Sequence, residues 1–266
     1  MAVIQQTSLI DRIVSMSPSL KNVLREEKPL IGTLVTTASP EIAEVLALAG
    51  FDWLFIDLEH GCLTIQDAQR AIQAVAGRCF TVVRVPDATD ENIKRVLDTG
   101  CDGIIAPHVN TVDEARKIVA LAKYPPDGER SAGLGRAQGY GLNFAAYIAS
   151  ANSQTVVVLQ IEHKDGVANV NEILQVQGID ALFIGPYDLS GSMGILGQVS
   201  DARVVAAIDK VRAACVAANM PLGIFCATAE RASAAIETGA RIVAVGTDLS
   251  HMSNSARMSL EAIRKS

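Results

Sequence analysis

The feature that most constrains this 266-residue chain is a regular alternation of short apolar runs with longer amphipathic stretches. The stretch 39–50 is typical, because Ser39 suits an N-cap, Pro40 the first helical position and Gly50 the helix end. Eight such strand–helix units in about 250 residues predict a TIM (β/α)8 barrel. A doubly wound open sheet is the alternative, but no GxGxxG follows the first strand. The predicted strands are 30–36, 52–57, 80–86, 102–107, 155–162, 180–185, 221–226 and 241–246.

The chain divides into an N-terminal extension, residues 1–28, and a single barrel domain, residues 29–266, since no composition break splits the latter. A helix is expected near Ser17, with Pro18 at its first position. One long polar segment, 125–150, interrupts the alternation, and we interpret it as an active-site loop.

Composition indicates a well-packed soluble protein, with 49% hydrophobic, 20% charged and 4% aromatic residues. The net charge of −6 and the lack of a Lys/Arg run argue against nucleic acid as a partner. No apolar run approaches the roughly 20 residues of a membrane span. Asp11 and Arg12 argue against a secretory signal. Five cysteines without a CxxC pair favour a reducing cytoplasm over a disulfide framework.

Polar side chains follow several of the apolar runs at the point where each predicted strand ends. In "DWLFIDLEHG" the run closes on Asp57, and Glu59 and His60 follow. Active sites of TIM barrels lie at these carboxyl ends, so the repetition predicts a site there. For any single residue the alternative is that a strand end is polar because it meets solvent. The other polar strand ends are Arg84, His108, Gln160, Glu162, His163, Asp188 and Asp248.

The chemistry of these side chains suggests a metal site and an anion clamp. Glu162 and Asp188 follow adjacent strands, and two carboxylates with water suit Mg²⁺, Mn²⁺ or Co²⁺ better than Zn²⁺. The alternative for these acids is a salt bridge at the rim, such as Glu162 with Lys164. Arg84 lies between valines and therefore needs an anion, either a neighbouring acid or a substrate carboxylate.

His60 stands beside Glu59 and near Asp57, which is the arrangement of an oriented general base. The alternative is a histidine that caps the following helix.

Taken together, several motifs resemble the class II pyruvate-dependent aldolases of the HpcH/HpaI family, which cleave 2-keto-3-deoxy acids and belong to the phosphoenolpyruvate/pyruvate barrel superfamily. The similarity runs from about Pro29 to the end, and residues before it carry none of the motifs. The motifs are "AGFDWLFIDLEHG", "VVRVP", "IKRVLDTGCDGIIAP", "YPPDGERS", "QIEHKDGVANVNEI" and "GIDALFIGPYDLSGSMG".

The resemblance implies a divalent metal held by Glu162 and Asp188, with no organic cofactor. Pyruvate would chelate this metal through its keto oxygen and one carboxylate oxygen. Arg84 would hold the carboxylate and stabilise the enolate oxygen, and Gln160 would hydrogen-bond near the same group. Backbone amides at Tyr187 and Asp188, at a helix start, would assist in binding the carboxylate.

The resemblance also implies that His60 acts through a metal-bound water as base for the aldol hydroxyl. The acid that orients it would be Asp57 or Asp98, the latter from the same or a neighbouring subunit. Glu59 would orient the metal waters. The C-terminal helix would pack on a neighbouring subunit of a homotrimer or homohexamer. The substrates would be a small 2-keto acid and an aldehyde, in the cytoplasm.

Three residues depart from the family pattern. His163 stands where threonine is common, Tyr187 where a small residue is usual, and His108 where a less basic residue is expected. Tyr187 adds bulk or a hydroxyl donor near the proposed metal. His163, directly after Glu162 on a strand, should point to the opposite face and pack in a second layer.

Arg130 and Arg136, in the long loop, are candidates to bind the aldehyde half of the substrate, with solvated loop arginines as the alternative.

The sequence is compatible with four interpretations of function or mechanism. The leading one is cleavage of a 2-keto-4-hydroxy acid to pyruvate and an aldehyde, with the reverse aldol addition. The same site could instead serve oxaloacetate decarboxylation or a carbon–carbon bond-forming synthase. Lys164 offers a Schiff-base mechanism. A catalytically silent ligand-binding barrel is the non-enzymatic alternative, against which the retained polar set argues.

Overall fold

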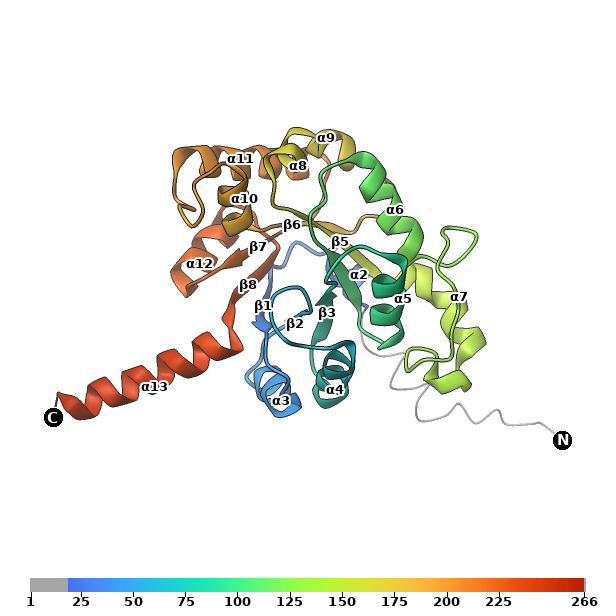
Figure 1. Ribbon diagram of the computed structural model, residues 1–266, viewed down its shortest axis with the longest axis horizontal. Helices are drawn as coiled ribbons and strands as arrows, with labels where there is room; N and C mark the ends of the chain where they lie inside the picture. Colours follow the sequence, from blue (N-terminus) through green and yellow to red (C-terminus); the bar gives the residue numbers. More distant parts are fainter. Residues whose placement is uncertain (1–18, 266) are drawn as a thin grey trace.

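The computed structural model, which describes residues 19–265, is a closed barrel of eight parallel strands (Figure 1). Each strand pairs with the next along the chain, and β8 closes on β1. The predicted TIM barrel is therefore confirmed, with strand bounds within about two residues of those expected. The strands are β1 (Leu30–Val35), β2 (Trp53–Asp57), β3 (Phe80–Arg84), β4 (Gly103–Ala106), β5 (Val156–Ile161), β6 (Ala181–Ile184), β7 (Leu222–Cys226) and β8 (Ile242–Thr247).

Helices connect the strands and form the outer layer. Many of them begin at a hydroxyl or carboxylate N-cap, as at Thr64, whose side chain and that of Asp67 form a reciprocal capping box. The helices are α2 (Leu20–Val23), α3 (Pro40–Leu48), α4 (Ile65–Val75), α5 (Asp90–Asp98), α6 (Val112–Ala122), η1 (Gly139–Gly141), α7 (Phe144–Gln154), α8 (Lys164–Ala168), α9 (Val170–Ile173), α10 (Pro186–Ser192), α11 (Ala202–Ala217), α12 (Ala229–Glu237) and α13 (Asp248–Arg264).

Side chains that alternate along each strand divide the core into two layers. One buried cluster takes the inward positions, including Trp53 and Phe55 of β2, Val82 of β3 and Val158 of β5. The intervening positions, such as Leu54, join a larger cluster beneath the helices. Because the period of a strand is two, the inward rows continue to Asp57, Arg84, Gln160 and Glu162 at the carboxyl ends.

Helix α2 closes the amino-terminal end of the barrel, where Leu20 and Leu24 join the inner cluster. Among the described residues this helix begins at Leu20, with Ser19 as its N-cap. The expected helix start at Ser17 and Pro18 lies outside the described residues, as does most of the extension 1–28.

The structure contradicts the prediction that segment 125–150 is an active-site loop. This segment follows α6 and precedes β5, so it lies at the amino-terminal end of the strands and contains the start of α7. Arg130 and Gln138 from this segment both bond to Asp98 at the end of α5. The prediction of an active-site loop is therefore wrong for the chain's own barrel, because active-site loops follow strands.

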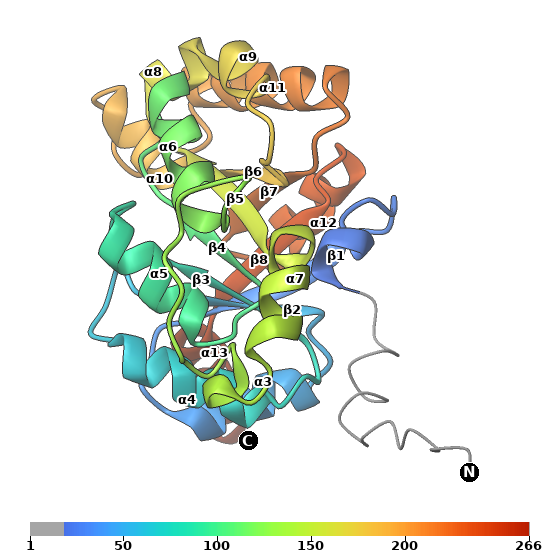
Figure 2. The same cartoon turned by 90° about the vertical axis from the view of Figure 1, so that its right-hand side faces the viewer.

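Helix α13 projects away from the barrel (Figure 1), and in the view of Figure 2 it lies behind the barrel. Its side chains Met252, Met258 and Leu260 are exposed. No helix in the described part of the chain is long and apolar enough to cross a membrane.

Candidate functional site

The register of β2 and β3 sets Asp57 directly beside Arg84 at the carboxyl end of the barrel. Arg84 donates from Nε to Asp57 Oδ1 at 2.9 Å and from Nη2 to Asp57 Oδ2 at 2.7 Å. The guanidinium also lies over the Phe55 ring, 5.1 Å from its centroid. Burial opposes the charged form, yet the hydrogen bonds and charge of Asp57 outweigh it and raise the pKa of Arg84.

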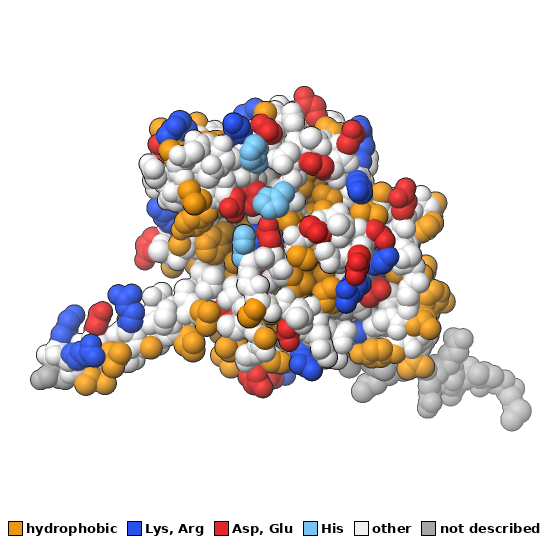
Figure 3. Space-filling view, in the orientation of Figure 1, with side chains coloured by type: hydrophobic (Ala, Val, Ile, Leu, Met, Phe, Trp, Pro, Cys, Tyr) orange, Lys and Arg blue, Asp and Glu red, His pale blue; other side chains and the backbone are white. Residues whose placement is uncertain are grey.

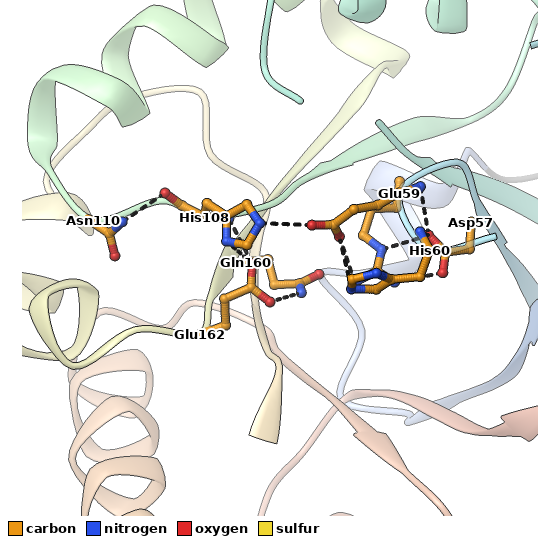
Figure 4. A network of polar contacts seen from close by, with 8 residues as sticks. Asp57, Glu59, His60, His108, Asn110, Gln160 and Glu162 are labelled. Carbon is orange, nitrogen blue, oxygen red and sulfur yellow. Dashed lines mark hydrogen bonds and ion pairs between the residues drawn. The ribbon is translucent and has the colours of Figure 1, made fainter. Parts of the chain in front are cut away.

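Glu59 and His108 extend this pair across the barrel mouth (Figure 4). Arg84 Nη1 lies 2.9 Å from Glu59 Oε2, and His108 Nε2 lies 2.9 Å from Glu59 Oε1. The other ring nitrogen of His108, Nδ1, lies 3.0 Å from Glu162 Oε1. One imidazole therefore bridges two carboxylates that come from different strand ends.

Glu162 is buried, and three groups hold its carboxylate. The His108 amide donates to Oε1 at 2.8 Å, His108 Nδ1 faces the same oxygen, and Gln160 Nε2 donates to Oε2. Burial raises the pKa of Glu162 despite these contacts. Gly185 lies against the carboxylate, since a Cβ there would come within 2.7 Å of Glu162 Oε2.

The cluster fits a divalent cation. Ligand atoms of Glu59, His108 and Glu162 lie within 4.8 Å of one another. Gln160 is only 2% exposed, and its Oε1 has no hydrogen-bond partner among the described residues. Such an orphaned acceptor requires a cation, a water or a ligand close by. Carboxylate oxygens with one imidazole are donors that divalent metals accept.

His60 lies at the edge of this group, and its ring is exposed. Its Nε2 is 4.0 Å from Glu59 Oε2, whereas Asp57 accepts a hydrogen bond from the His60 amide at 3.3 Å. Asp57 thus fixes the backbone at His60, while its carboxylate is engaged by Arg84. In this chain Glu59 is the acid that contacts the His60 ring.

Two predicted residues lie outside the cluster. Asp98 ends α5 at the opposite end of the barrel, where its Oδ1 accepts from Arg130 Nη2 at 2.7 Å. Asp188 is half-buried in the first turn of α10, and its side chain makes none of the hydrogen bonds or ion pairs found in residues 19–265. The structure does not bring Asp188 into the group that Glu59, His108 and Glu162 form.

The remaining departures occupy peripheral positions. His163 is the N-cap of α8, where its Nδ1 accepts from the Asp165 amide at 3.2 Å, and it is not part of the group of Glu59, His108 and Glu162. Tyr187 is 42% exposed and lies near Phe225, with ring centroids 6.3 Å apart. Lys164 is exposed at the start of α8.

Asp248 also serves a structural purpose. It accepts hydrogen bonds from the amides and hydroxyls of Thr36 and Thr37, at 2.6–2.9 Å. These bonds tie the start of α13 to the end of β1.

His108 is one of the polar strand ends predicted from the sequence, which assigned it no role in the site. Its position shortly after β4 could have indicated a place in the site, just as the position of Glu59 after β2 did. Nothing in the sequence indicated that it would lie between two acids. On the face seen in Figure 3, histidine and acidic side chains gather near the centre.

The fold and this geometry define a class of protein: a TIM barrel with an acidic, arginine-containing site at the carboxyl ends of its strands. Residues 30–255 match the family model described as HpcH/HpaI aldolase/citrate lyase. The chain belongs to this family, and the resemblance noted in the sequence is confirmed.

Relatives extend over nearly the whole chain. A 4-hydroxy-2-oxovalerate aldolase from Novosphingobium aromaticivorans is 39% identical over 86% of this chain and 88% of its own length. The crystal structure of a family member from Burkholderia cenocepacia is 36% identical, with a TM-score of 0.89 over 92% of this chain and 98% of that one. A citrate synthase structure is 28% identical, with a TM-score of 0.83 over 93% of this chain and 98% of that one.

Proposed function

We propose that the protein is a divalent-metal-dependent aldolase that cleaves a 2-keto-4-hydroxy acid to pyruvate and an aldehyde, and that it also catalyses the reverse addition. The observation that carries the proposal is the buried set of Arg84, Gln160 and Glu162 at one end of the barrel, in a family whose members include pyruvate aldolases. Mg²⁺, Mn²⁺ and Co²⁺ are the candidate metals, and Glu162 and Asp188 are the proposed carboxylate ligands.

The metal would act as a Lewis acid that polarises the keto group and stabilises negative charge on its oxygen. The donor set supports this role, because ligand atoms of Glu162, Glu59 and His108 lie within 4.8 Å of one another. A half-buried Asp188 without a side-chain partner among the described residues is free to ligate. Glu59, close to both His60 and His108, would orient water in the site.

Arg84 would bind the substrate carboxylate and the developing enolate oxygen. A guanidinium has five N–H donors; two bond to Asp57, and Nη1 forms an ion pair with Glu59. The N–H groups of Nη1 and Nη2 that Asp57 does not take are available to substrate oxygens, and the Asp57 fork fixes the direction in which they point. Gln160 would hydrogen-bond near the same group through the Nε2 N–H that Glu162 does not take.

His60 would take the proton of the C4 hydroxyl. The C3–C4 bond then breaks, its electron pair passes to the keto oxygen as an enolate, and the aldehyde leaves. Protonation of C3 gives the methyl group of pyruvate. The exposed ring of His60 reaches solvent, so it can pass its proton on.

Exchange of the pyruvate methyl protons tests the proposal without knowledge of the aldehyde. Proton NMR in D₂O would follow the methyl signal with Mg²⁺ or Mn²⁺, then with excess chelator. Metal-dependent loss of the signal is the expected result. Exchange that persists with chelator would contradict metal dependence and point to another route. No exchange with either metal would contradict the aldolase proposal.

A second candidate is a synthase or an oxaloacetate decarboxylase that uses the same site. The similarity to a citrate synthase favours it, as does the bulk of Tyr187 next to Phe225 beside the first turn of α10. Enolate formation without retro-aldol cleavage would favour this second candidate.

A Schiff base on Lys164 has little support, because an exposed lysine lacks the desolvation that activates such amines.

We also propose a cytoplasmic homo-oligomer, a trimer or hexamer, in which α13 packs on a neighbouring subunit. The exposed side chains of Leu249, Met252 and Leu260 support this, because they lie on one face of α13 and an exposed apolar face favours contact with a partner. Light scattering on Leu260→Glu should show smaller particles than wild type. Asn254→Glu, on the opposite face of the same helix, is the control for added charge. Equal particle size in both variants would contradict the proposal.

A further inference from the structure

His108 holds its imidazole at a spacing that suits a metal ligand. Two ligand atoms that bind one ion at a right angle, each about 2.1 Å away, lie about 3.0 Å apart. His108 Nδ1 lies 3.0 Å from Glu162 Oε1. This nitrogen and this oxygen can therefore occupy neighbouring positions around one cation.

The second ring nitrogen of His108 has the partner that coordinating histidines usually have. A metal-bound imidazole commonly donates its other N–H to a carboxylate, which fixes the tautomer and the ring orientation. Glu59 Oε1 lies 2.9 Å from His108 Nε2, and Glu59 Oε2 lies 2.9 Å from Arg84 Nη1. The carboxylate of Glu59 is thus held in place and orients the ring.

The backbone at His108 is constrained to present this side chain. Its φ of +59° lies in the left-handed region, which is unfavourable for a residue with a Cβ. Three hydrogen bonds hold the loop: from the His108 amide to Glu162, from the Val109 amide to the Gln160 carbonyl at 3.2 Å, and from Asn110 Nδ2 to the His108 carbonyl at 3.0 Å. Figure 4 shows His108 between Glu59 and Glu162.

An independent observation points to a ligand at the same place. Gln160 is almost completely buried beside Glu162, and its Oε1 lacks a partner among the described residues. Its Nε2 already donates to Glu162, so the amide cannot turn to satisfy both atoms at once. A cation or its bound water would supply the missing donor or positive charge.

We propose that His108 is a nitrogen ligand of the divalent cation site, with Nδ1 bound beside Glu162 and Nε2 donating to Glu59. This inference rests on the proposed function, because the cation is the one that the aldolase would use. An imidazole ligand shifts preference from Mg²⁺ toward Co²⁺, Ni²⁺ and Zn²⁺, in keeping with ligand softness and the Irving–Williams order.

Pulsed EPR of the full-length protein loaded with Mn²⁺ provides the test. Directly bound imidazole nitrogen modulates the electron spin echo of Mn²⁺, so wild type should show ¹⁴N modulation. His108→Asn should lose it, and asparagine suits the left-handed backbone at this position. His163→Asn removes a histidine that caps α8 outside the cluster, and this variant should keep the modulation. Mn²⁺ bound to wild type without ¹⁴N modulation would overturn the role of His108.

Calorimetric titration with Co²⁺ and with Mg²⁺ gives a second readout. His108→Asn should weaken Co²⁺ binding about tenfold or more and change Mg²⁺ binding much less. Equal losses for both ions would overturn a nitrogen-specific role. If neither Mn²⁺ nor Co²⁺ binds wild type, this inference and the metal dependence of the proposed function both fail. Binding without a contribution from His108 leaves the proposed function standing.

Discussion

The carboxylate of Asp57 and the guanidinium of Arg84 meet through two parallel hydrogen bonds, 2.9 and 2.7 Å long, on neighbouring strands of the barrel. Both side chains are buried, so the pair is a fixed structural unit and not a surface contact. Its geometry leaves the three other guanidinium N–H groups, on Nη1 and Nη2, directed elsewhere. This pair is therefore the rigid base of the proposed carboxylate clamp.

Arg84→Lys should abolish most activity while retaining the positive charge. A lysine ammonium cannot reproduce the fork toward Asp57 and also bind a carboxylate. Loss of one charged hydrogen bond costs about 1.5–3 kcal/mol, or roughly 10- to 150-fold in kcat/KM for methyl exchange. Arg95→Lys, in an exposed pair with Glu91, is the control and should be neutral. Turnover close to wild type in Arg84→Lys would disprove the clamp.

Glu162→Gln should remove metal-dependent activity without loss of fold. Burial disfavours the charged carboxylate, as its raised pKa indicates, so a neutral isostere should not destabilise the metal-free protein. Thermal unfolding with and without Mn²⁺ measures the effect. At 100 times Kd the ion should stabilise wild type by about 2.7 kcal/mol and the variant by much less. Equal stabilisation of both proteins would mean that Glu162 is not a ligand.

Gly185→Ala should damage the site through sterics alone. The added Cβ would come within 2.7 Å of Glu162 Oε2 and 3.1 Å of Gln160 Nε2, so the carboxylate must move. We expect metal affinity to fall by about tenfold or more. Gly191→Ala, whose Cβ would meet the end of the exposed Leu196 side chain, is the matched control in α10. Similar calorimetric affinities for the two variants would refute this account.

Asp248→Asn should destabilise the fold by about 1–3 kcal/mol at neutral pH, because charged hydrogen bonds from Thr36 and Thr37 are lost. Burial opposes ionisation, but these bonds outweigh it and lower the pKa of Asp248. The stabilisation is complete above the unfolded pKa of about 3.9 and disappears as pH falls through the lower folded value. Urea unfolding should therefore show a difference from wild type at pH 7 that shrinks toward pH 2.

The control for this pH dependence is Asp209→Asn on the exposed face of α11. It should change the free energy of unfolding by less than about 0.5 kcal/mol. A difference between Asp248→Asn and wild type that stays constant with pH would show that the lowered pKa of Asp248 does not contribute.

The sequence by itself determined the barrel and the row of polar strand ends. Apolar runs of strand length that alternate with capped helices admit few other folds, and a period of two fixes which side chains face inward. Asp57, Arg84, Gln160 and Glu162 were therefore predictable as neighbours at one end.

Only the tertiary structure determined which of the polar side chains at the strand ends are in contact. His108 lies between Glu59 and Glu162 because a left-handed backbone residue turns the loop after β4 back over the barrel, and single-residue patterns do not reveal such a turn. The segment 125–150 looked like an active-site loop because it is polar and irregular. Because it follows a helix, it lies at the amino-terminal end of the barrel, where Arg130 forms an ion pair with Asp98.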